Sequence, residues 1–271
     1  MPMFESYLSR WNLVPDGAPI QTHAARLLPV THQGAPAMLK IAEQEDERQG
    51  GVLMRWWNGQ GAARVLAHDE DAILLERAMG SQSLSAYART GRDDEATRIL
   101  CNVLKALHAP RAQPLPPLRG LEEWFVDLWP MARAHGGILA QSALHARALL
   151  DDPREVTVLH GDMHHDNVLD FGERGWLVID PKRLTGERAF DYANIFCNPD
   201  LSDPVPPVAT VPGRFERRLQ IIVEESGLDR RRLLQWVVAW CGLSAAWYLA
   251  DGDDAAVDLN IAHQAHALLR A

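Results

Sequence analysis

The stretch HGDMHHDNVLDFGERGWLVID, residues 160–180, decides how the chain is interpreted. It gathers histidines, aspartates and one asparagine between two apolar, β-rich runs, VTVLH at residues 156–160 and GWLVID at residues 175–180. Runs of this composition predict strands, and we expect the two to form a hairpin whose loop carries the chemistry. The loop is compatible with a metal centre, with a histidine-dependent hydrolase site, or with a site that uses its carboxylates.

The histidines do not fit the first two kinds of site. His164 and His165 are adjacent, so a regular element cannot easily turn both toward one metal, and their spacing differs from that of a helical HExxH pair. GDMH resembles the GDxH ligand turn of metallophosphatases, but the chain lacks the further Asn and His clusters that such sites need. It also has no GxSxG elbow of a serine hydrolase.

The carboxylates fit phosphoryl transfer. This reaction needs a carboxylate to take the proton of the attacking hydroxyl, and hard oxygen ligands for Mg²⁺ beside the phosphates. Asp162 follows the first apolar run, Asn167 comes five residues later, and Asp180 ends the second run. The spacing matches a kinase catalytic loop, with Asp180 at the position of the DFG aspartate. The sequence therefore predicts Asp162 as the base and Asn167 and Asp180 as magnesium ligands.

A kinase also needs a strand-borne lysine on the ATP phosphates, paired with a helical glutamate. Lys40 in PAMLKIA meets this demand, although a lysine at a sheet edge is the alternative. Its partner is expected on EQEDERQGG, with Glu47 preferred and Glu43 as the alternative. AILLERAMG is interpreted as the last strand before the hinge, where backbone groups near Glu76 and Ala78 bind adenine.

The loop that covers the phosphates is poorly marked. The sequence contains no GxGxxG motif, so the loop must be either Asp16 to Pro19 or the turn His32 to Gly34.

Two parts of the chain differ in pattern. Short apolar runs and turn signals from about Ile20 to Leu75 predict a small antiparallel sheet, interrupted by one helix at residues 43–57. Beyond Ser81 the pattern is mainly helical, with helices predicted at residues 92–109, 122–132, 214–225 and 229–250. We therefore expect an α+β fold of two lobes: residues 1–78, a hinge near 76–80, and residues 79–271.

Composition limits the partners and the compartment. The 271 residues include 27 basic and 36 acidic ones, a net charge of −9, which argues against nucleic acid and suits a cationic small molecule. Cys101, Cys197 and Cys241 form no CxxC pair, and no secretory signal precedes the first strand, so a reducing cytoplasm is expected.

One apolar segment, LLQWVVAWCGLSAAWYLA at residues 233–250, meets the minimum length of a membrane span. Gln235 lies inside it and no second apolar segment accompanies it. A buried helix of the larger lobe is therefore the preferred interpretation, and no membrane is expected as a partner.

Several motifs together resemble the aminoglycoside phosphotransferase superfamily, which shares the eukaryotic protein kinase fold. The chain is most similar to the streptomycin 6-kinase branch, also called the aminoglycoside/hydroxyurea resistance kinases. The motifs are MLKIA, RWWNGQGAARVLAHDEDAILLERA, VLHGDMHHDNVL, GWLVIDPKRLTGERAFDYANIFCNP and LSAAWYLADGD, and they span residues 39–253.

The resemblance implies a protein-kinase-like fold, ATP and Mg²⁺ as cofactors, and the same roles for Asp162, Asn167, Asp180, Lys40 and Glu47. It also implies that His160 is structural, that His164 orients the loop and that Asp191 ties the loop down. A streptomycin-type aminoglycoside is the leading acceptor. The alternatives are a metabolic kinase of a sugar, an amino alcohol or a hydroxyurea-like compound, and an inactive nucleotide-binding scaffold.

Four acids, Asp251, Asp253, Asp254 and Asp258, follow the helix that bears Trp247 and Tyr248. The simpler interpretation is a solvated helix start, with Asp253 or Asp254 as its cap. The functional one is that Asp251 and Asp253 border the acceptor cleft, where they bind a guanidinium group that rests on Trp247.

Overall fold

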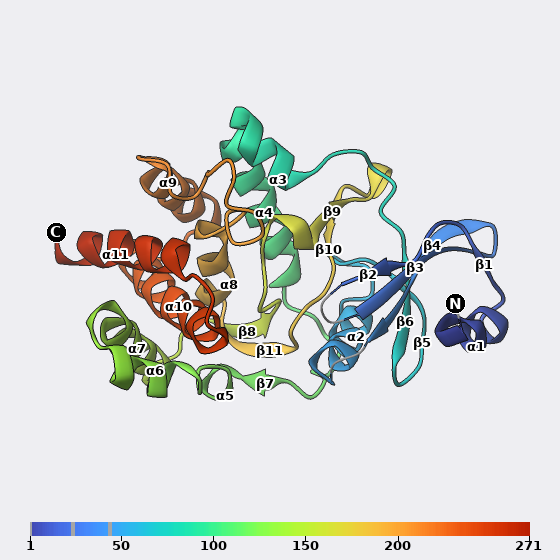
Figure 1. The fold of residues 1–271 in the computed structure, drawn as a ribbon, viewed down its shortest axis with the longest axis horizontal. Coiled ribbons are helices and arrows are strands. Elements are labelled where there is room, and N and C mark those ends of the chain that lie inside the picture. Colours follow the sequence, from blue (N-terminus) through green and yellow to red (C-terminus); the bar gives the residue numbers. More distant parts are fainter. Residues whose placement is uncertain (1, 23–24, 43–44) are drawn as a thin grey trace.

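The structure, a computed structural model, describes the backbone of residues 2–22, 25–42 and 45–271, and side chains over 4–22, 25–42 and 51–271. Figure 1 shows a sheet with two helices at one end of the molecule and a larger, mainly helical part at the other. Together they form the bilobal, kinase-like α+β fold that the sequence predicts.

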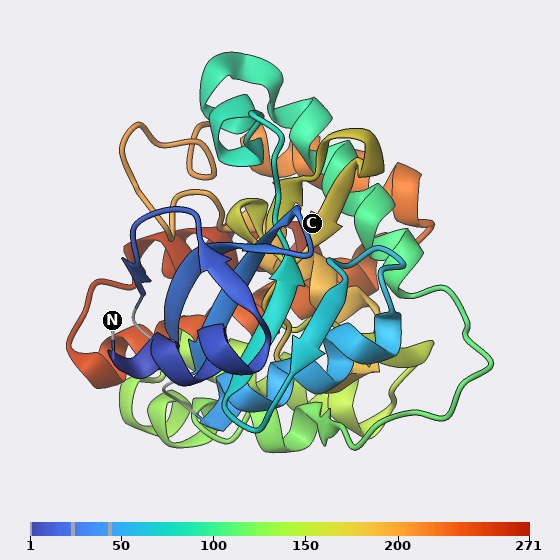
Figure 2. The ribbon, with the colours of Figure 1, turned by 90° about the vertical axis from the view of Figure 1, so that its right-hand side faces the viewer.

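The first lobe is a six-stranded antiparallel sheet in the order β1-β3-β4-β6-β5, with β2 also paired to β3. The strands are β1 (Leu13–Pro15), β2 (Ile20–Gln21), β3 (Ala25–His32), β4 (Ala35–Ala42), β5 (Val65–His68) and β6 (Ala72–Glu76). Helix α1 (Pro2–Arg10), which the sequence analysis did not predict, lies across the outward face of the sheet (Figure 2).

Side chains alternate between the two faces of this sheet. Leu39 and Ile41 of β4 join a core with Leu28, Leu74 and the α1 residue Phe4. The intervening Lys40 therefore points to the opposite face, toward the second lobe. Its side chain is buried, and the position in the strand explains why.

Helix α2 (Glu45–Trp57) belongs to the second, larger core. Its residues Leu53, Met54 and Trp57 are buried there, and the Trp57 ring stacks on His160 of the catalytic loop with ring centroids 6.3 Å apart. The helix predicted at this place is confirmed, and it joins the sheet to the second lobe.

The second lobe is built around α10 (Arg230–Asp251), which packs on α7 (Gly137–Asp151), α8 (Ala189–Ala193) and α11 (Ala256–Arg270). The remaining helices are α3 (Leu84–Tyr87), α4 (Asp93–Leu107), α5 (Leu121–Trp124), α6 (Leu128–His135) and α9 (Arg214–Ser226). The predictions for α4, α9 and α10 are confirmed to within a few residues, whereas α7 and α11 were not predicted.

Helix α10 contains the apolar segment considered as a membrane span. Within the described ranges it is the one helix long and apolar enough to cross a membrane, and 72% of its apolar window is buried. The carboxylate of Asp229 caps its start by accepting from the Arg232 N–H at 2.8 Å. This is the interior helix that the sequence predicted.

The single helix predicted at residues 122–132 is wrong, because the chain forms α5 and α6 with a turn between them. Pro130 has no N–H and would break a continuous helix. With α6 beginning at Leu128, Pro130 falls in the first turn, where that N–H is not needed.

The hairpin predicted between VTVLH and GWLVID is also wrong in its pairing. Strand β8 (Val156–Leu159) pairs with β11 (Leu184–Glu187), which also pairs with β7 (Arg119–Gly120). GWLVID forms β10 (Trp176–Val178), whose partner is β9 (Val168–Asp170). Residues 160–167 separate β8 from β9, and the two strands belong to different sheets.

The linker between the lobes is fixed to this hairpin at Gly80. Its N–H donates to the Asp170 carbonyl at 2.9 Å. A Cβ at Gly80 would lie 1.9 Å from Cγ of Asp170, so the close approach requires glycine.

Candidate active site

The catalytic loop begins with a buried, neutral histidine. His160 Nε2 donates to the Ile179 carbonyl at 2.8 Å, and its Nδ1 accepts from the Asp162 N–H at 3.2 Å. Burial lowers the pKa of His160, in agreement with one proton on the ring. His160 is therefore structural, as the resemblance implied, and it links Asp162 to the residue after β10.

A second anchor is Asp191 at the start of α8. Its buried carboxylate accepts from the N–H groups of His160 at 2.9 Å and Gly161 at 2.8 Å, and lies 2.8 Å from His108 Nε2. Gly161 has a φ of 84°, and a Cβ there would lie 2.8 Å from the Leu184 side chain. The expectation that Asp191 ties down the loop is confirmed.

Asp162 presents two distinct carboxylate oxygens. Oδ1 accepts from Asn194 Nδ2 at 3.1 Å, and Oδ2 has a long contact of 3.4 Å from Asn167 Nδ2. His164 Nε2 lies 3.8 Å from Oδ1 and Lys182 Nζ 3.8 Å from Oδ2. Burial opposes ionisation, but His164 and Lys182 outweigh it and hold the pKa of Asp162 below its usual value.

The loop also contains a short 3-10 turn over His165–Asn167. His164 caps it, because its Nδ1 accepts from the Asp166 N–H at 3.3 Å. This is the orienting role expected for His164.

Asn194, which donates to Asp162, is itself held by a buried polar network that the sequence analysis missed. Asn198 Nδ2 donates to Asn194 Oδ1 at 2.7 Å, which turns the Asn194 amide nitrogen toward Asp162. The carbonyl of Asn198 in turn accepts from Arg218 at 2.6 Å.

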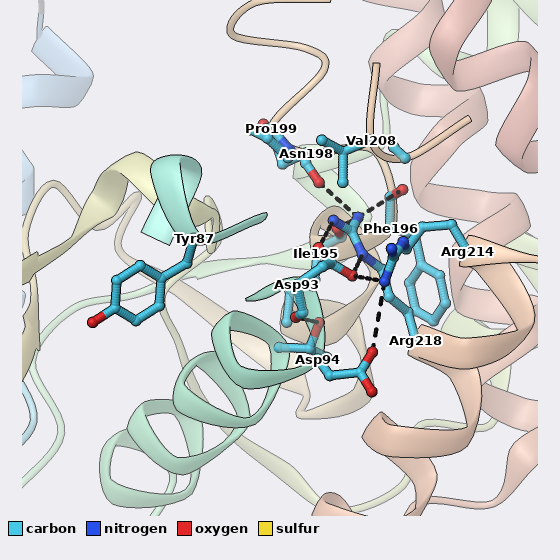
Figure 3. A network of polar contacts seen from close by, with 12 residues as sticks. Tyr87, Asp93, Asp94, Ile195, Phe196, Asn198, Pro199, Val208, Arg214 and Arg218 are labelled. Carbon is cyan, nitrogen blue, oxygen red and sulfur yellow. Dashed lines mark hydrogen bonds and ion pairs between the residues drawn. The ribbon is translucent and has the colours of Figure 1, made fainter. Parts of the chain in front are cut away.

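Arg218 is fully buried and pairs with Asp93 of α4 at 2.5 Å (Figure 3). It also donates to the Ile195 carbonyl at 2.7 Å. Removing one partner of such a buried pair typically costs about 3–5 kcal/mol. The network therefore fixes the segment that carries Asn194 and Asn198.

Asn167 and Asp180 are the two predicted magnesium ligands. Asn167 Nδ2 donates to the Asp162 carbonyl at 2.8 Å, which leaves its amide oxygen as a ligand atom. The Asn167 carbonyl accepts from the Ile179 N–H at 2.9 Å, so Asp180 follows directly beside it. A carboxylate and an amide oxygen are hard ligands, and the pair fits Mg²⁺.

Lys40 approaches this place from the sheet. Its Nζ lies 2.6 Å from Oδ1 of Asp180. Glu47 lies on α2 with its side chain outside the described residues, and Glu43 is outside them altogether. The lysine predicted for the phosphates is thus next to a predicted metal ligand, whereas its pairing with Glu47 stays a prediction.

The two residues predicted at the hinge differ in what surrounds them. The Glu76 N–H donates to the Arg64 carbonyl at 3.0 Å, and its carboxylate binds the Arg64 N–H at 2.6 Å and the Arg174 guanidinium. Ala78 lies in the linker itself, partly buried against the second core.

The structure brings neither predicted phosphate loop to Lys40. The turn at His32–Gly34 closes one end of the β3–β4 hairpin. Lys40 pairs with Leu27 near the open end, so it is far from this turn. Asp16 instead pairs with Arg77 of the linker at 2.5 Å.

Next to the base lies a cavity of about 330 Å³. Its walls come from the catalytic loop, the segment after α8 and the end of α10, and its lining residues are Asp162, His164, Asn194, Asn198, Leu201, Ser202, Trp240, Ser244, Trp247, Tyr248, Asp251 and Asp253. The predicted acceptor residues Trp247, Asp251 and Asp253 thus share one cavity with the predicted base.

The four acids after α10 have different surroundings. Asp251 and Asp253 are exposed and line the cavity. Asp254 accepts from the Ala256 N–H at 2.9 Å at the start of α11. Asp258 is buried, and burial raises its pKa to about 7. Asp254 thus contacts the start of α11, as the simpler interpretation expects of one of these acids, whereas acceptor binding by Asp251 and Asp253 stays a prediction.

Trp247 is fixed at the cavity wall. Its Nε1 donates to Asp127 at 3.0 Å, and its ring meets the edge of Trp124 with centroids 5.6 Å apart. The orientation is set by α5 and the turn after it, so the ring is in place before any ligand binds.

A strand lysine, a catalytic loop and a strand-end aspartate on two lobes define a kinase-like phosphotransferase with an alcohol group as acceptor. Residues 10–252 match the family of aminoglycoside/hydroxyurea antibiotic resistance kinases. The chain belongs to this family, and ATP use follows from it.

The relatives and solved structures agree with this assignment. The chain is 54% identical to a streptomycin 3''-kinase of Klebsiella pneumoniae, over 97% of this chain and 100% of the relative. It is 32% identical to a streptomycin 6-kinase of Streptomyces glaucescens, over 97% and 89%. An aminoglycoside phosphotransferase solved with ADP and hygromycin B shares the fold, with a TM-score of 0.66, 16% identity, and coverage of 100% and 98%.

Proposed function

We propose that this protein transfers the γ-phosphate of ATP to a hydroxyl of a streptomycin-type aminoglycoside and so inactivates the antibiotic. The observation that carries the proposal is the cavity that joins Asp162 to Asp251, Asp253 and Trp247. A base at one end and acids with an aromatic ring at the other suit an acceptor that presents both a hydroxyl and a cation.

The base acts through one oxygen. Because Asn194 occupies Oδ1 of Asp162, Oδ2 is the atom that takes the proton of the acceptor hydroxyl. The long contact from Asn167 to Oδ2 is the weaker of the two and is readily given up.

ATP binds between the lobes in this proposal. Lys40 neutralises its phosphates, Asn167 and Asp180 hold Mg²⁺, and Ala78 offers its backbone to adenine, because the Glu76 N–H is already engaged. The lobe boundary then falls between residues 1–78 and 79–271.

The 3''-hydroxyl of streptomycin is the proposed position of phosphorylation, since the relative at 54% identity is a streptomycin 3''-kinase. The guanidinium groups of streptomycin lie on another ring, so they extend from the base toward Asp251 and Asp253. The proposed compartment is the cytoplasm, which supplies ATP and suits the buried free thiols Cys101, Cys197 and Cys241.

A product assay tests the function. Purified protein with Mg·ATP is offered streptomycin, hygromycin B, ethanolamine, hydroxyurea and glucose, and products are analysed by mass spectrometry. We expect one added phosphate on streptomycin, with phosphorus–proton NMR coupling at the 3'' position. Phosphate only on ethanolamine, hydroxyurea or glucose would mean a metabolic kinase, and none on any compound an inactive scaffold.

The acidic wall makes a further prediction about salt. Asp251→Asn and Asp253→Asn should each raise the KM for streptomycin about tenfold at low salt, because each removes a charge-assisted hydrogen bond. The increase should shrink at high salt, where wild-type affinity is already weakened by screening. The KM for ATP should stay unchanged in both variants.

Asp254→Asn is the matched control. It removes the same charge from the same loop, but the residue is outside the cavity lining. Its carboxylate accepts from the Ala256 N–H at the start of α11, and asparagine keeps that acceptor oxygen. An equal rise in KM for all three variants would show a general field effect, and no rise in any would remove the acidic wall from the acceptor site.

A further inference from the structure

Lys182 lies on the loop that joins the predicted metal ligand Asp180 to β11. Its N–H donates to the His160 carbonyl at 2.7 Å, so the backbone of this loop is fixed to the start of the catalytic loop. Its Nζ reaches to 3.8 Å from Oδ2 of Asp162, and 24% of the side chain is exposed. The backbone of Lys182 is therefore fixed, and its ammonium group lies beside the Asp162 oxygen that takes the proton in the proposed reaction.

We propose that Lys182 is a further catalytic residue, whose ammonium group contacts the phosphoryl group as it passes from ATP to the acceptor. The inference rests on the proposed function. The attacking hydroxyl must lie about 2.6–3.2 Å from the base, in line with the phosphorus atom. A cation 3.8 Å from that base oxygen is within reach of the oxygens that the phosphorus carries.

Phosphoryl transfer needs positive charge beside the transferred group. In phosphoryl transfer, negative charge spreads over the three equatorial oxygens of the transferred group, and catalysis is mainly positioning and charge stabilisation. Lys40 approaches from the sheet and contacts Asp180, which is the ATP side. Lys182 stands on the acceptor side, next to Asp162. The two lysines would then neutralise the transferred group from opposite sides.

The other basic side chain near Asp162 is less suited to this role. The ring of His164 is held as a cap by the Asp166 N–H and faces Oδ1, the oxygen that Asn194 also occupies. Lys182 faces Oδ2, where the reaction takes place. A flexible ammonium group can also follow the phosphoryl group over the short distance of the transfer.

The rival explanation is that Lys182 only orients Asp162. The 3.8 Å separation is too long for a hydrogen bond, and Asp162 is already oriented by Asn194 and its loop contacts. The two explanations differ in whether the variant loses affinity for a mimic of the transferred phosphoryl group.

The test compares Lys182→Met with Arg183→Met, which removes the neighbouring cation of the same loop. Lys182→Met should lower kcat by roughly 10²- to 10³-fold with the KM for ATP nearly unchanged. Affinity for Mg·ADP with aluminium fluoride, measured calorimetrically with streptomycin present, should fall by a similar factor, while affinity for Mg·ADP alone should not. Lys182→Arg should recover part of both, and Arg183→Met should match wild type.

Three results decide the matter. Equal effects of Lys182→Met and Arg183→Met would overturn the proposal, and so would a loss of turnover with full affinity for the fluoride complex. Slow ATP hydrolysis without acceptor is measured for both variants as well. If wild type phosphorylates no aminoglycoside, the proposed function fails. The proposed role of Lys182 is still supported if only Lys182→Met loses affinity for the fluoride complex and loses ATP hydrolysis.

Discussion

Asp162→Asn should lower turnover by roughly 10²- to 10⁴-fold and leave the affinity for ATP nearly unchanged. Asparagine has the same shape, and its amide oxygen can still accept from Asn194, so the loop keeps its structure. What it loses is the basic oxygen beside the cavity, and with it the group that takes the acceptor's proton. The measurements are kcat with streptomycin and the Kd of ATP by calorimetry.

Asp166→Asn is the matched control, because Asp166 lies on the same loop and is exposed, and its carboxylate accepts from the Ser85 hydroxyl at 2.5 Å. It should retain near wild-type turnover. If Asp162→Asn kept wild-type turnover as well, another group would have to be the base and the assignment of the whole loop would fail.

Three of the proposed site residues lie close together in sequence and were chosen for that reason. Asp162, Asn167 and Asp180 follow one another at fixed spacing around apolar runs, and the spacing alone carries the chemistry. Lys40 was singled out because it ends an apolar run, with a lysine at a sheet edge as the alternative. The structure excludes that alternative, because β4 lies between β3 and β6. The structure then places Lys40 and Asp180 in direct contact.

The side chains that hold Asp162 and its loop in place were not predictable in the same way. Asn194, His108 and Arg218 are ordinary polar residues far from Asp162 in sequence, and no local pattern distinguishes them. They meet only because α4, α8 and α9 pack around the catalytic loop. Their contribution depends on tertiary packing, which a single sequence does not display.

The fold shows the same division. The apolar runs of β3 to β6, β8 and β10 were found, and the antiparallel sheet of the first lobe was predicted correctly. The pairing of β8 with β10 was wrong, since β8 pairs with β11 and β10 with β9. Composition determines whether a segment is extended, whereas register and partner depend on the course of the chain between strands. The helices α7 and α11 were not predicted, although their buried residues recur at helical spacing. Several of these buried residues are small or polar, such as Ser142 and Ala146 in α7 and Asp258 in α11, so the apolar pattern is weak in sequence.

Asp180→Ala should raise the Mg²⁺ concentration needed for half-maximal turnover by roughly tenfold or more, and should lower turnover at saturating Mg²⁺ by about 10²-fold. The variant loses a charged oxygen ligand and also the carboxylate that contacts Lys40. Asn167→Ala should shift the Mg²⁺ requirement in the same direction but less, because it loses a neutral oxygen.

The measurement is a Mg²⁺ titration of the initial rate at fixed, saturating ATP, with Glu173→Ala as the control. Glu173 is an exposed carboxylate in the turn of the same β9–β10 hairpin, so it tests whether any lost acid on this element changes the response. A response of Asp180→Ala identical to wild type would place the metal elsewhere. An equal response of Asn167→Ala and Asp180→Ala would mean that charge is not what holds it. The predicted order, with Asp180 first, Asn167 second and Glu173 without effect, follows from ligand charge and position alone.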